Sequence, residues 1–581
     1  MQRGISVLAF FVPAFIMLVL FIIRGIYPFG DRSFLFSDMY HQYMPFLSEF
    51  VHKIKAGEGL FYSYNVGIGS NFLALYVYYL ASPFNWLVFL LPEGLIMEFM
   101  SYLVILRIGL MGLTFSIYLR KVFGKEDPAA LLFSTAYALS GYLAAYNWNV
   151  MWLDCLILLP LILLGAERLV REGKWVMYTV TLGLCILTNY YISIMICIFL
   201  VLYFGMLLIT EYYTMTEGQS RKARIVFGRI GRFAFASLLA GGLAAALLIP
   251  EVCAILRTDF GNSDFPGTLE SYFSVFDMLA RHCLCVTTER GLEHWPNIYC
   301  GVAVFLLVPM YALNEKISVR KRFCNLALAG FLLLSFGTNV LDFLWHGLNY
   351  PDSLPARQSF LYIFLILVMC YDAFRNVEGT SPRQIIYGYL AAVIFLLACE
   401  KFVESEDFDT GIEVLTLVFV TIYGVLLYLY RTRKDELTRQ VLGILVLACI
   451  VAELSINTFN TSLGTTGRSA YLGDQEDYKA LYALTQEQEG DDFFRIEKFT
   501  RKTKNDGTLT GYPTASVFSS TMNSNVMDLY KMLGMRHSKV YYGFDGATAF
   551  VSALLNVDYM FGESDKYENG LYEIVNNSGD V

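Results

Sequence analysis

Apolar residues along this chain come in blocks about as long as a membrane is thick. Blocks of roughly 18–25 residues cross a bilayer core of about 30 Å as helices, and polar segments separate the blocks here. About thirteen crossings are predicted, at residues 5–27, 95–119, 129–146, 150–166, 175–188, 191–210, 225–250, 298–313, 323–345, 360–374, 385–399, 412–430 and 441–459. The pattern therefore predicts an all-α polytopic membrane bundle over residues 1–459.

The loops between these blocks differ in charge. Lys and Arg gather in every second connection, as at residues 120–125, 168–174 and 316–322, whereas the alternate set is poor in them and includes the acidic run 404–407. Since cytoplasmic loops carry the excess of Lys and Arg, this alternation predicts a cytoplasmic N-terminus and places the second set of loops outside.

Two of the predicted outward segments are longer than connections need to be. They cover residues 28–94 and 251–296, and loops of this size usually carry function or structure of their own. Beyond residue 459 the composition turns polar, with short strand-like runs at 493–496 and 540–542. Residues 460–581 are expected to form a small extracytoplasmic domain of α+β or β-rich type.

Composition narrows the class of protein further. Of the 581 residues, 56% are hydrophobic and only 16% are charged, against about 25% charged in ordinary soluble domains. This balance excludes a soluble enzyme and makes the lipid bilayer a partner. The net charge of −8 and the lack of a basic tract argue against nucleic acid as a partner.

The first outward segment contains an amphipathic stretch that begins near Ser37 and ends near Gly57. Apolar residues recur there at steps of three and four, namely Met39, Tyr43, Phe46, Leu47, Phe50, Val51 and Ile54. We expect a helix that Ser37 caps and that lies along the outer membrane surface. Asp38 falls in its first turn, with Gln42 on the same face and His41 one turn away. Asp38 either helps to cap this helix or serves as a carboxylate for catalysis or metal binding.

Further polar residues stand at the outward ends of predicted spans, where they are costly and often functional. Asp154 is expected to face the same mouth as Asp38, so that two carboxylates form an acid–base or metal-binding pair. Arg357 lies just outside a span, where a guanidinium suits a phosphate at headgroup level, although ordinary snorkelling is the alternative. Candidates for a wall around sugar or isoprenoid are Trp148, Trp152, Asn189 and Tyr190.

An ordered series of motifs resembles the bacterial YfhO family of membrane proteins, which are related to the GT-C glycosyltransferases. The motifs are SDMYHQYMPF (37–46), SPFNWL (82–87), MWLDCLILLPLILLGAE (151–167), TNYY (188–191), PARQSF (355–360) and LLNVDYMFG (554–562). The resemblance implies transfer of a sugar from a polyprenyl-phosphate carrier to a cell-envelope acceptor, such as teichoic acid, on the outer face of a bacterial cell membrane. It assigns catalysis to Asp38 with Asp154 as a second acid, and phosphate recognition to Arg357.

Other readings of the same residues stay open. A divalent cation, Mg²⁺ or Mn²⁺, is an optional cofactor. A transporter or flippase for a lipid-linked precursor, without bond chemistry, fits the many spans and the mid-span Arg107, and an assembly scaffold is a third function. Polar groups gathered at one outward rim favour the enzyme over both. Relatives continue past the last motif to a final membrane helix, so we expect the outward domain to be incomplete here.

Overall fold

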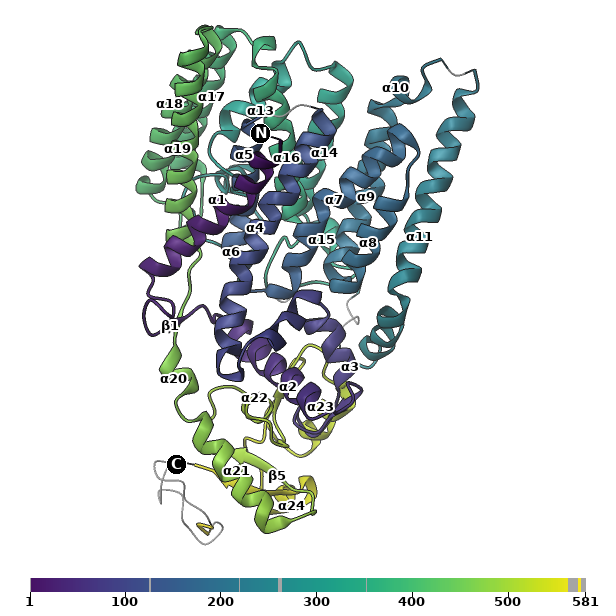
Figure 1. Ribbon diagram of the computed structural model, residues 1–581, viewed down its shortest axis with the longest axis vertical. Coiled ribbons are helices and arrows are strands. Elements are labelled where there is room, and N and C mark those ends of the chain that lie inside the picture. Colours follow the sequence, from purple (N-terminus) through teal and green to yellow (C-terminus); the bar gives the residue numbers. More distant parts are fainter. Residues whose placement is uncertain are drawn as a thin grey trace.

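A computed structural model describes residues 2–562, apart from 125–126, 219, 260–263 and 352, together with residues 573–575. Long helices run side by side and form most of the molecule (Figure 1). They are α1 (Gln2–Ile23), α4 (Ile96–Phe123), α5 (Ala129–Ala138), α6 (Gly141–Tyr146), α7 (Leu153–Glu172), α8 (Val176–Thr188), α9 (Tyr190–Thr210), α11 (Lys222–Ile255), α13 (Val304–Leu313), α14 (Val319–Phe336), α16 (Ser359–Arg375), α17 (Pro382–Phe402), α18 (Thr410–Thr432) and α19 (Glu436–Thr461). The shorter helices are α10 (Tyr212–Thr216), α12 (Val275–Ala280) and α15 (Asn339–Trp345).

Nine helical stretches of the described chain are long and apolar enough to cross a membrane. They are Gly4–Ile23, Ile96–Phe123, Ala129–Tyr146, Val150–Glu172, Tyr190–Thr210, Lys222–Ile255, Pro382–Phe402, Thr410–Thr432 and Glu436–Thr461. The expected count of about thirteen is therefore not confirmed. Some predicted spans form shorter apolar helices, such as α8 with 13 residues and α13 with 10 residues. The multi-pass character of the chain is clear even at the lower count.

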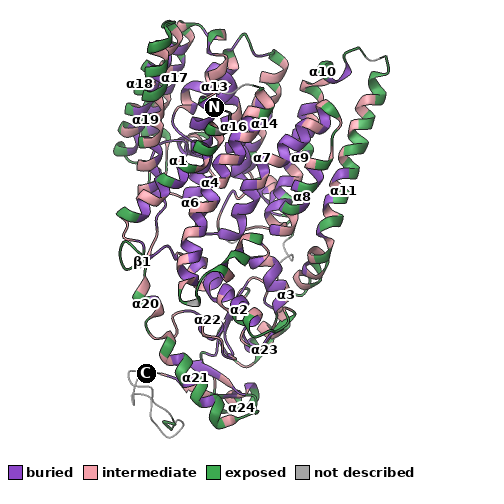
Figure 2. Ribbon diagram, in the orientation of Figure 1, coloured by how far each residue is buried: buried purple, intermediate pink, exposed green. Residues whose placement is uncertain are grey.

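Burial separates the centre of the bundle from its lipid-facing rim. Helices α4, α5, α7 and α16 are largely buried, whereas α11 and the group α17–α19 show long exposed stripes (Figure 2). Helix α11 packs on α8 and buries few side chains, three of them alanines spaced by four residues. Small residues let two helices approach closely, and the remaining apolar face of α11 is left for lipid.

The first outward segment folds into a compact layer at one end of the bundle. It contains β1 (Arg32–Ser33), the π-helix η1 (Met39–Tyr43), α2 (Met44–Lys55), β2 (Tyr62–Ser63), β3 (Ser70–Asn71), α3 (Phe72–Leu75), the π-helix η2 (Tyr76–Leu80) and the 3₁₀ helix η3 (Pro83–Leu90). The stretch Phe72–Leu80 and Pro83–Leu90 is apolar enough for a membrane but bends by 97° at its break. Such a bend is typical of a broken span or a re-entrant loop.

The predicted amphipathic helix exists, but protein rather than a membrane surface covers it. Helix α2 packs against α22 (Asp506–Thr510) as well as η2, and it buries Glu49 and Lys53 together with its apolar stripe. Ser37 is not its cap, because the backbone of Ser37 is left-handed with φ 50°. The C-terminal segment packs over the face that we expected to meet solvent.

Residues after α19 add short helices and strands at the same end of the molecule as α2 (Figure 1). The helices are α20 (Arg468–Leu472), α21 (Gln475–Glu489), α23 (Ser524–Met532) and α24 (Ala549–Leu555). Strands β5 (Arg495–Lys498) and β9 (Val557–Phe561) pair in parallel, while β6 (Val517–Phe518), β8 (Tyr541–Tyr542) and β7 (His537–Ser538) form an antiparallel sheet. Strand β4 (Thr466–Gly467) pairs with β1, which joins this segment to the first outward segment.

Candidate functional site

A cavity of about 410 Å³ lies where the bundle meets residues 28–94 and the C-terminal segment. Its wall combines side chains from η1, η2, the start of α9, residues 346–351 and 353–357 between α15 and α16, and the C-terminal segment. The polar and aromatic residues at its surface are Asp38, Gln42, Tyr43, Tyr78, Tyr79, Asn149, Trp152, Tyr190, Tyr191, Thr258, His346, Asn349, Tyr350, Ser353, Arg357, Phe518, Ser520 and Thr521. Mostly aromatic cavities with a few convergent polar groups are typical ligand sites.

Asp38 is the acidic residue of this wall. It occupies the cap position of η1 but makes no capping hydrogen bond, so the capping role that we considered is not found. Burial raises the pKa of Asp38 to about 6, while the charge of Arg357 acts in the opposite direction. Among the residues that the structure describes, none donates a hydrogen bond to this carboxylate, which is therefore free to receive a proton from a ligand.

Arg357 is held firmly on the other side of the cavity. Its Nη1 donates to Tyr191 Oη at 2.7 Å, and its Nε and Nη2 donate to the carbonyl oxygens of Leu354 and Ser353 at 3.0 and 2.9 Å. The guanidinium carbon also lies 5.4 Å from the ring centre of Trp152. Because a guanidinium has five N–H groups, these three contacts orient it and leave further donors for an anion.

The backbone beside both charged residues is strained. Ser37 precedes Asp38 with φ 50°, and Leu354 and Ala356 near Arg357 have φ 59° and 48°. Non-glycine residues in the left-handed region cost of order 1 kcal/mol each, and such strain gathers at functional sites. The chain thus presents Asp38 and Arg357 from two loops in conformations that the surrounding fold must stabilise.

Tyrosines form most of the aromatic wall. Tyr43 donates a hydrogen bond to Asn149 Oδ1, and the ring centroids of Tyr43 and Tyr79 are 5.6 Å apart in an edge arrangement. Tyr78 makes a similar contact with Tyr190 at 6.0 Å. These contacts between rings, together with the hydrogen bond to Asn149, fix the positions of the tyrosine side chains.

The C-terminal segment closes the cavity from the outward side. Phe518, Ser520, Thr521 and Val540 belong to its wall, and the Ser520 amide donates to Tyr79 Oη at 2.8 Å. Residues about 480 positions apart therefore share one site.

Several residues singled out from the sequence meet at this cavity and others do not. Asp38, Gln42, Trp152, Tyr190 and Arg357 line it. The remaining candidates, Asp154, His41, Trp148 and Asn189, have other surroundings.

Asp154 lies in the bundle interior instead of beside Asp38. Its Oδ1 accepts a hydrogen bond from Arg107 Nε at 2.9 Å, and both side chains are almost fully buried. Arg107 also donates to Ser82 Oγ at 2.9 Å. The expected pair of Asp38 and Asp154 in one cavity is thus corrected to an ion pair between α4 and α7.

The other three candidates have contacts within the protein. The side chain of Asn189 caps α9 by accepting from the Ile192 amide at 2.8 Å. Trp148 donates from Nε1 to the Ala145 carbonyl at 2.7 Å. The ring of His41 contacts Tyr40 at 4.7 Å between centroids, and burial lowers the pKa of His41. None of the three is among the residues that line the cavity, and their roles in substrate binding stay predictions.

His346 is a cavity residue that the sequence pattern did not single out. It follows α15 with Asp342 four positions earlier, and it is one of only 6 histidines in the chain. The sequence feature that could have identified His346 is its position just beyond a predicted span, with an acidic residue one helical turn before it. No sequence feature identified Tyr78 and Tyr79 as cavity residues, because their apolar stretch lies inside a predicted loop.

The optional divalent cation has no ligand set in the described residues. No group of three or more His, Cys, Asp or Glu side chains there fits a metal ion. We therefore assign no residue to a metal.

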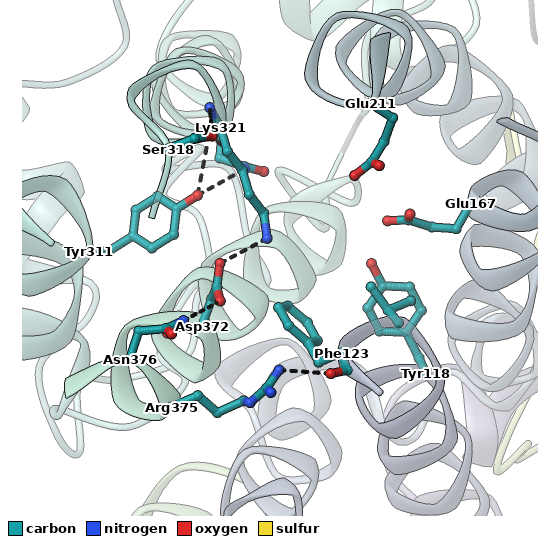
Figure 3. Close-up of polar contacts among 12 residues, drawn as sticks. Tyr118, Phe123, Glu167, Glu211, Tyr311, Ser318, Lys321, Asp372, Arg375 and Asn376 are labelled. Carbon is teal, nitrogen blue, oxygen red and sulfur yellow. Dashed lines mark hydrogen bonds and ion pairs between the residues drawn. The ribbon is translucent and has the colours of Figure 1, made fainter. Parts of the chain in front are cut away.

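A second polar cluster lies near the far end of α7, the helix whose first turn carries Asp154 (Figure 3). Lys321 Nζ lies 2.9 Å from Asp372 Oδ2, and Arg171 Nη2 lies 2.9 Å from carboxylate oxygens of both Glu167 and Glu211. A helix of 20 residues is about 30 Å long, so this cluster is remote from the cavity. Lys321 and Asp372 join α14 to α16, and Arg171 joins α7 to Glu211 at the end of α9.

Comparisons with known proteins agree with the pattern of motifs. The family model described as "Bacterial membrane protein YfhO" matches residues 9–579. The uncharacterized protein YfhO of Bacillus subtilis (strain 168) is 21% identical over 498 residues, covering 81% of this chain and 54% of that protein. The chain therefore spans about half the length of this curated relative.

Two solved structures show some similarity to this chain. Arabinofuranosyltransferase AftD from Mycobacteria has a TM-score of 0.48 at 13% identity, over 92% of this chain and 33% of that chain. ArnT from Cupriavidus metallidurans bound to undecaprenyl phosphate has a TM-score of 0.36 at 13% identity, over 86% of this chain and 83% of that chain.

Proposed function

The chain belongs to the YfhO family of bacterial membrane proteins, and from this premise we propose that it is a membrane glycosyltransferase of the GT-C type. It moves a sugar from a polyprenyl-phosphate carrier to a cell-envelope acceptor, with teichoic acid as the first candidate, on the outer face of the membrane. The observation that carries this function is one aromatic cavity containing both the unbonded carboxylate of Asp38 and the oriented guanidinium of Arg357.

Arg357 binds the phosphate of the lipid-linked donor. Arg357 lies just before α16, at one end of the bundle, and we expect lipid headgroups at that level. A guanidinium matches the geometry of phosphate oxygens and stays charged at any working pH. The isoprenoid tail then extends from the cavity into the bilayer.

Asp38 acts as the general base for the acceptor. A base is most effective when its pKa is close to the operating pH, and burial raises the pKa of Asp38 to about 6. The carboxylate is therefore mostly ionised at neutral pH and still basic enough to share the proton of an acceptor hydroxyl.

The transfer is a single displacement with inversion. The acceptor oxygen attacks the anomeric carbon while the bond from that carbon to the phosphate oxygen breaks, and the bonding electron pair leaves with the phosphate. The hydroxyl proton goes to Asp38. Arg357 stabilises the negative charge that develops on the leaving phosphate, and the cavity holds the reactants in line.

The aromatic wall suits a sugar. Sugar rings carry apolar C–H faces that pack on aromatic rings, while their hydroxyls need polar partners. Trp152 and Tyr79 supply such faces, and Gln42 and Asn149 supply amides in the same wall. One cavity thus offers contacts for the phosphate, the sugar and the acceptor hydroxyl.

The decisive experiment gives purified protein a polyprenyl-phosphate sugar and an envelope acceptor. We expect free polyprenyl phosphate and a glycosylated acceptor from the wild type, and neither from Asp38→Asn. Asp528→Asn makes the same chemical change at an exposed position of α23 and serves as the matched control with full activity. Retained transfer in Asp38→Asn contradicts the proposal.

A flippase without bond chemistry is the alternative, and one contact weakens it. The flippase hypothesis rested partly on Arg107 as a charge in the middle of a span. Asp154 forms an ion pair with Arg107, so this charge is explained without a transported substrate. In sealed vesicles, movement of the donor across the bilayer without release of carrier phosphate would favour the flippase.

A further inference from the structure

A second buried polar pair, Asp342 and His346, adjoins the cavity through His346, and the proposed reaction does not use it. The side chains of His346 and Asp342 are only 1% and 4% exposed, and His346 Nδ1 lies 3.0 Å from Asp342 Oδ1. The same nitrogen lies 2.8 Å from the Asp342 carbonyl oxygen, and Tyr272 donates to Asp342 Oδ2 at 3.2 Å. These contacts fix the imidazole ring in one orientation.

The other ring nitrogen, Nε2, belongs to a residue of the cavity wall. Within the part of the chain that the structure describes, His346 Nε2 has no hydrogen-bond partner although it is buried. Leaving a buried polar atom unpaired is costly, so each such atom in a native protein calls for an explanation such as a ligand contact. Fixing one nitrogen of a histidine through a carboxylate is also how proteins aim the other nitrogen at a ligand.

A second orphaned donor lies in the same wall. Trp152 Nε1 is buried and, among the described residues, has no acceptor. Trp152, His346 and Arg357 all line the cavity, and the Arg357 guanidinium lies over the Trp152 ring. An indole N–H can only donate, so the ligand that satisfies this group must bring an acceptor oxygen.

We propose that Arg357, His346 and Trp152 together form an anion subsite that takes the phosphate of the polyprenyl carrier. A phosphate offers several acceptor oxygens to donors that converge from different directions. Asp342 holds His346 at Nδ1, and Nε2 is the ring atom left to contact a phosphate oxygen. No proton is transferred, and Asp342 is a positioning residue. This role rests on the proposed function and adds two phosphate contacts to it.

Binding, measured without turnover, tests the subsite. The protein in detergent is titrated with polyprenyl phosphate, with polyprenol as the neutral control and inorganic phosphate as the headgroup alone. We expect the wild type to bind polyprenyl phosphate at least tenfold more tightly than either control, since a charge-assisted contact is worth about tenfold or more in affinity.

Two substitutions of His346 test the roles of its two ring nitrogens separately. Asparagine places its amide near the Nδ1 position, so His346→Asn keeps the contact with Asp342 but loses the group at Nε2. Glutamine reaches the Nε2 position. We expect His346→Asn to weaken binding of polyprenyl phosphate about tenfold and His346→Gln to weaken it less, with no change for polyprenol. Trp152→Phe keeps the aromatic ring, loses only the N–H, and is expected to weaken phosphate binding alone.

The outcomes distinguish this subsite from the proposed function. If polyprenyl phosphate binds tightly and unchanged in His346→Asn and Trp152→Phe, the subsite is overturned while the transferase proposal stands. If the wild type binds polyprenol equally well, the phosphate-carrier proposal itself fails. If inorganic phosphate binds as tightly as polyprenyl phosphate, the subsite takes a free phosphate and the carrier assignment is wrong. Should His346→Asn not fold, Trp152→Phe decides.

Discussion

Asp154 accepts a hydrogen bond of 2.9 Å from Arg107 inside the bundle, and the two side chains are 3% and 0% exposed. The pair links α4 to the first turn of α7, which follows the cavity residue Trp152 directly in the chain. Taking two charges out of water is costly, and the pair persists because each charge compensates the other. The contact therefore fixes the start of α7 directly after the cavity residue Trp152.

Breaking this pair is expected to destabilise the protein more than it affects chemistry. Asp154→Asn leaves Arg107 buried without a counter-charge, a change that typically costs about 3–5 kcal/mol. We expect a lower Tm in detergent and a lower yield of folded protein.

The double variant Arg107→Met with Asp154→Leu is the control, because apolar replacement of both partners is often neutral or stabilising. Recovery of both Tm and transfer identifies Asp154 as structural. A stable double variant without transfer would restore Asp154 as a catalytic candidate.

The activity of the wild type is expected to depend on the ionisation of Asp38. Its pKa is about 6, and only the carboxylate form accepts a proton. Below that pH, kcat/KM should fall about tenfold for each pH unit, and between pH 7 and 8 it should be nearly constant. Initial rates of carrier release over pH 5–8 measure the profile, and a flat profile through pH 6 would exclude Asp38 as the base.

The free energy of unfolding should change with pH in the direction opposite to activity: ionisation of Asp38 supports activity but lowers stability. The pKa is about 6 in the folded protein, against 3.8 for an unperturbed aspartate side chain, so the folded protein holds this proton more tightly than the unfolded chain does. The resulting stability is present below pH 3.8 and is lost as pH rises through 6.

Asp38→Asn removes the ionisation and should therefore stabilise the protein at pH 7 by up to about 3 kcal/mol, with little effect near pH 3.5. Tm values of both proteins at the two pH values test this. An equal or lower Tm for Asp38→Asn at pH 7 would contradict it.

The sequence predicts the helices more reliably than it predicts their contacts. Spans such as α4 and α18 follow from continuous apolar runs, because crossing a membrane requires them. Asp38 could be singled out because it begins an amphipathic stretch, and Arg357 because it stands just before an apolar run. The pairing of Asp154 with Arg107 could not, since it depends on the phase of α7 after the 3₁₀ turn Val150–Trp152, which turns Trp152 to the cavity and Asp154 inward.

The outward wall was beyond prediction for another reason. Phe518 and Val540 reach the cavity only because the C-terminal segment packs over α2. Periodicity reports the local environment of a residue and carries no information on contacts between segments so distant in the chain. The apolar stripe of α2, which suggested a membrane surface, is covered instead by rings of η2 and η3, with Phe46 on Tyr79 and Phe50 on Tyr76 and Trp86.

Replacing Arg357 by lysine should impair donor binding despite conservation of charge. Lysine cannot reproduce the three simultaneous contacts to Tyr191, Leu354 and Ser353, nor the planar fork that grips phosphate. We expect KM for the donor to rise about tenfold or more in Arg357→Lys, and further in Arg357→Gln. If Arg357→Lys keeps the wild-type KM, the residue supplies general positive charge only.

A larger side chain in the part of the wall formed by the C-terminal segment should hinder entry of the acceptor without affecting binding of the donor. Val540 belongs to the part of the cavity wall that the C-terminal segment forms, whereas Arg357 belongs to the part that the bundle forms. A tryptophan there occupies space in a cavity of about 410 Å³ that the acceptor would enter from outside. We expect Val540→Trp to raise KM for the acceptor while affinity for polyprenyl phosphate stays unchanged, and Val540→Ile to behave like the wild type. Equal losses for donor and acceptor would mean that the C-terminal segment shapes the whole cavity and does not form an acceptor entrance.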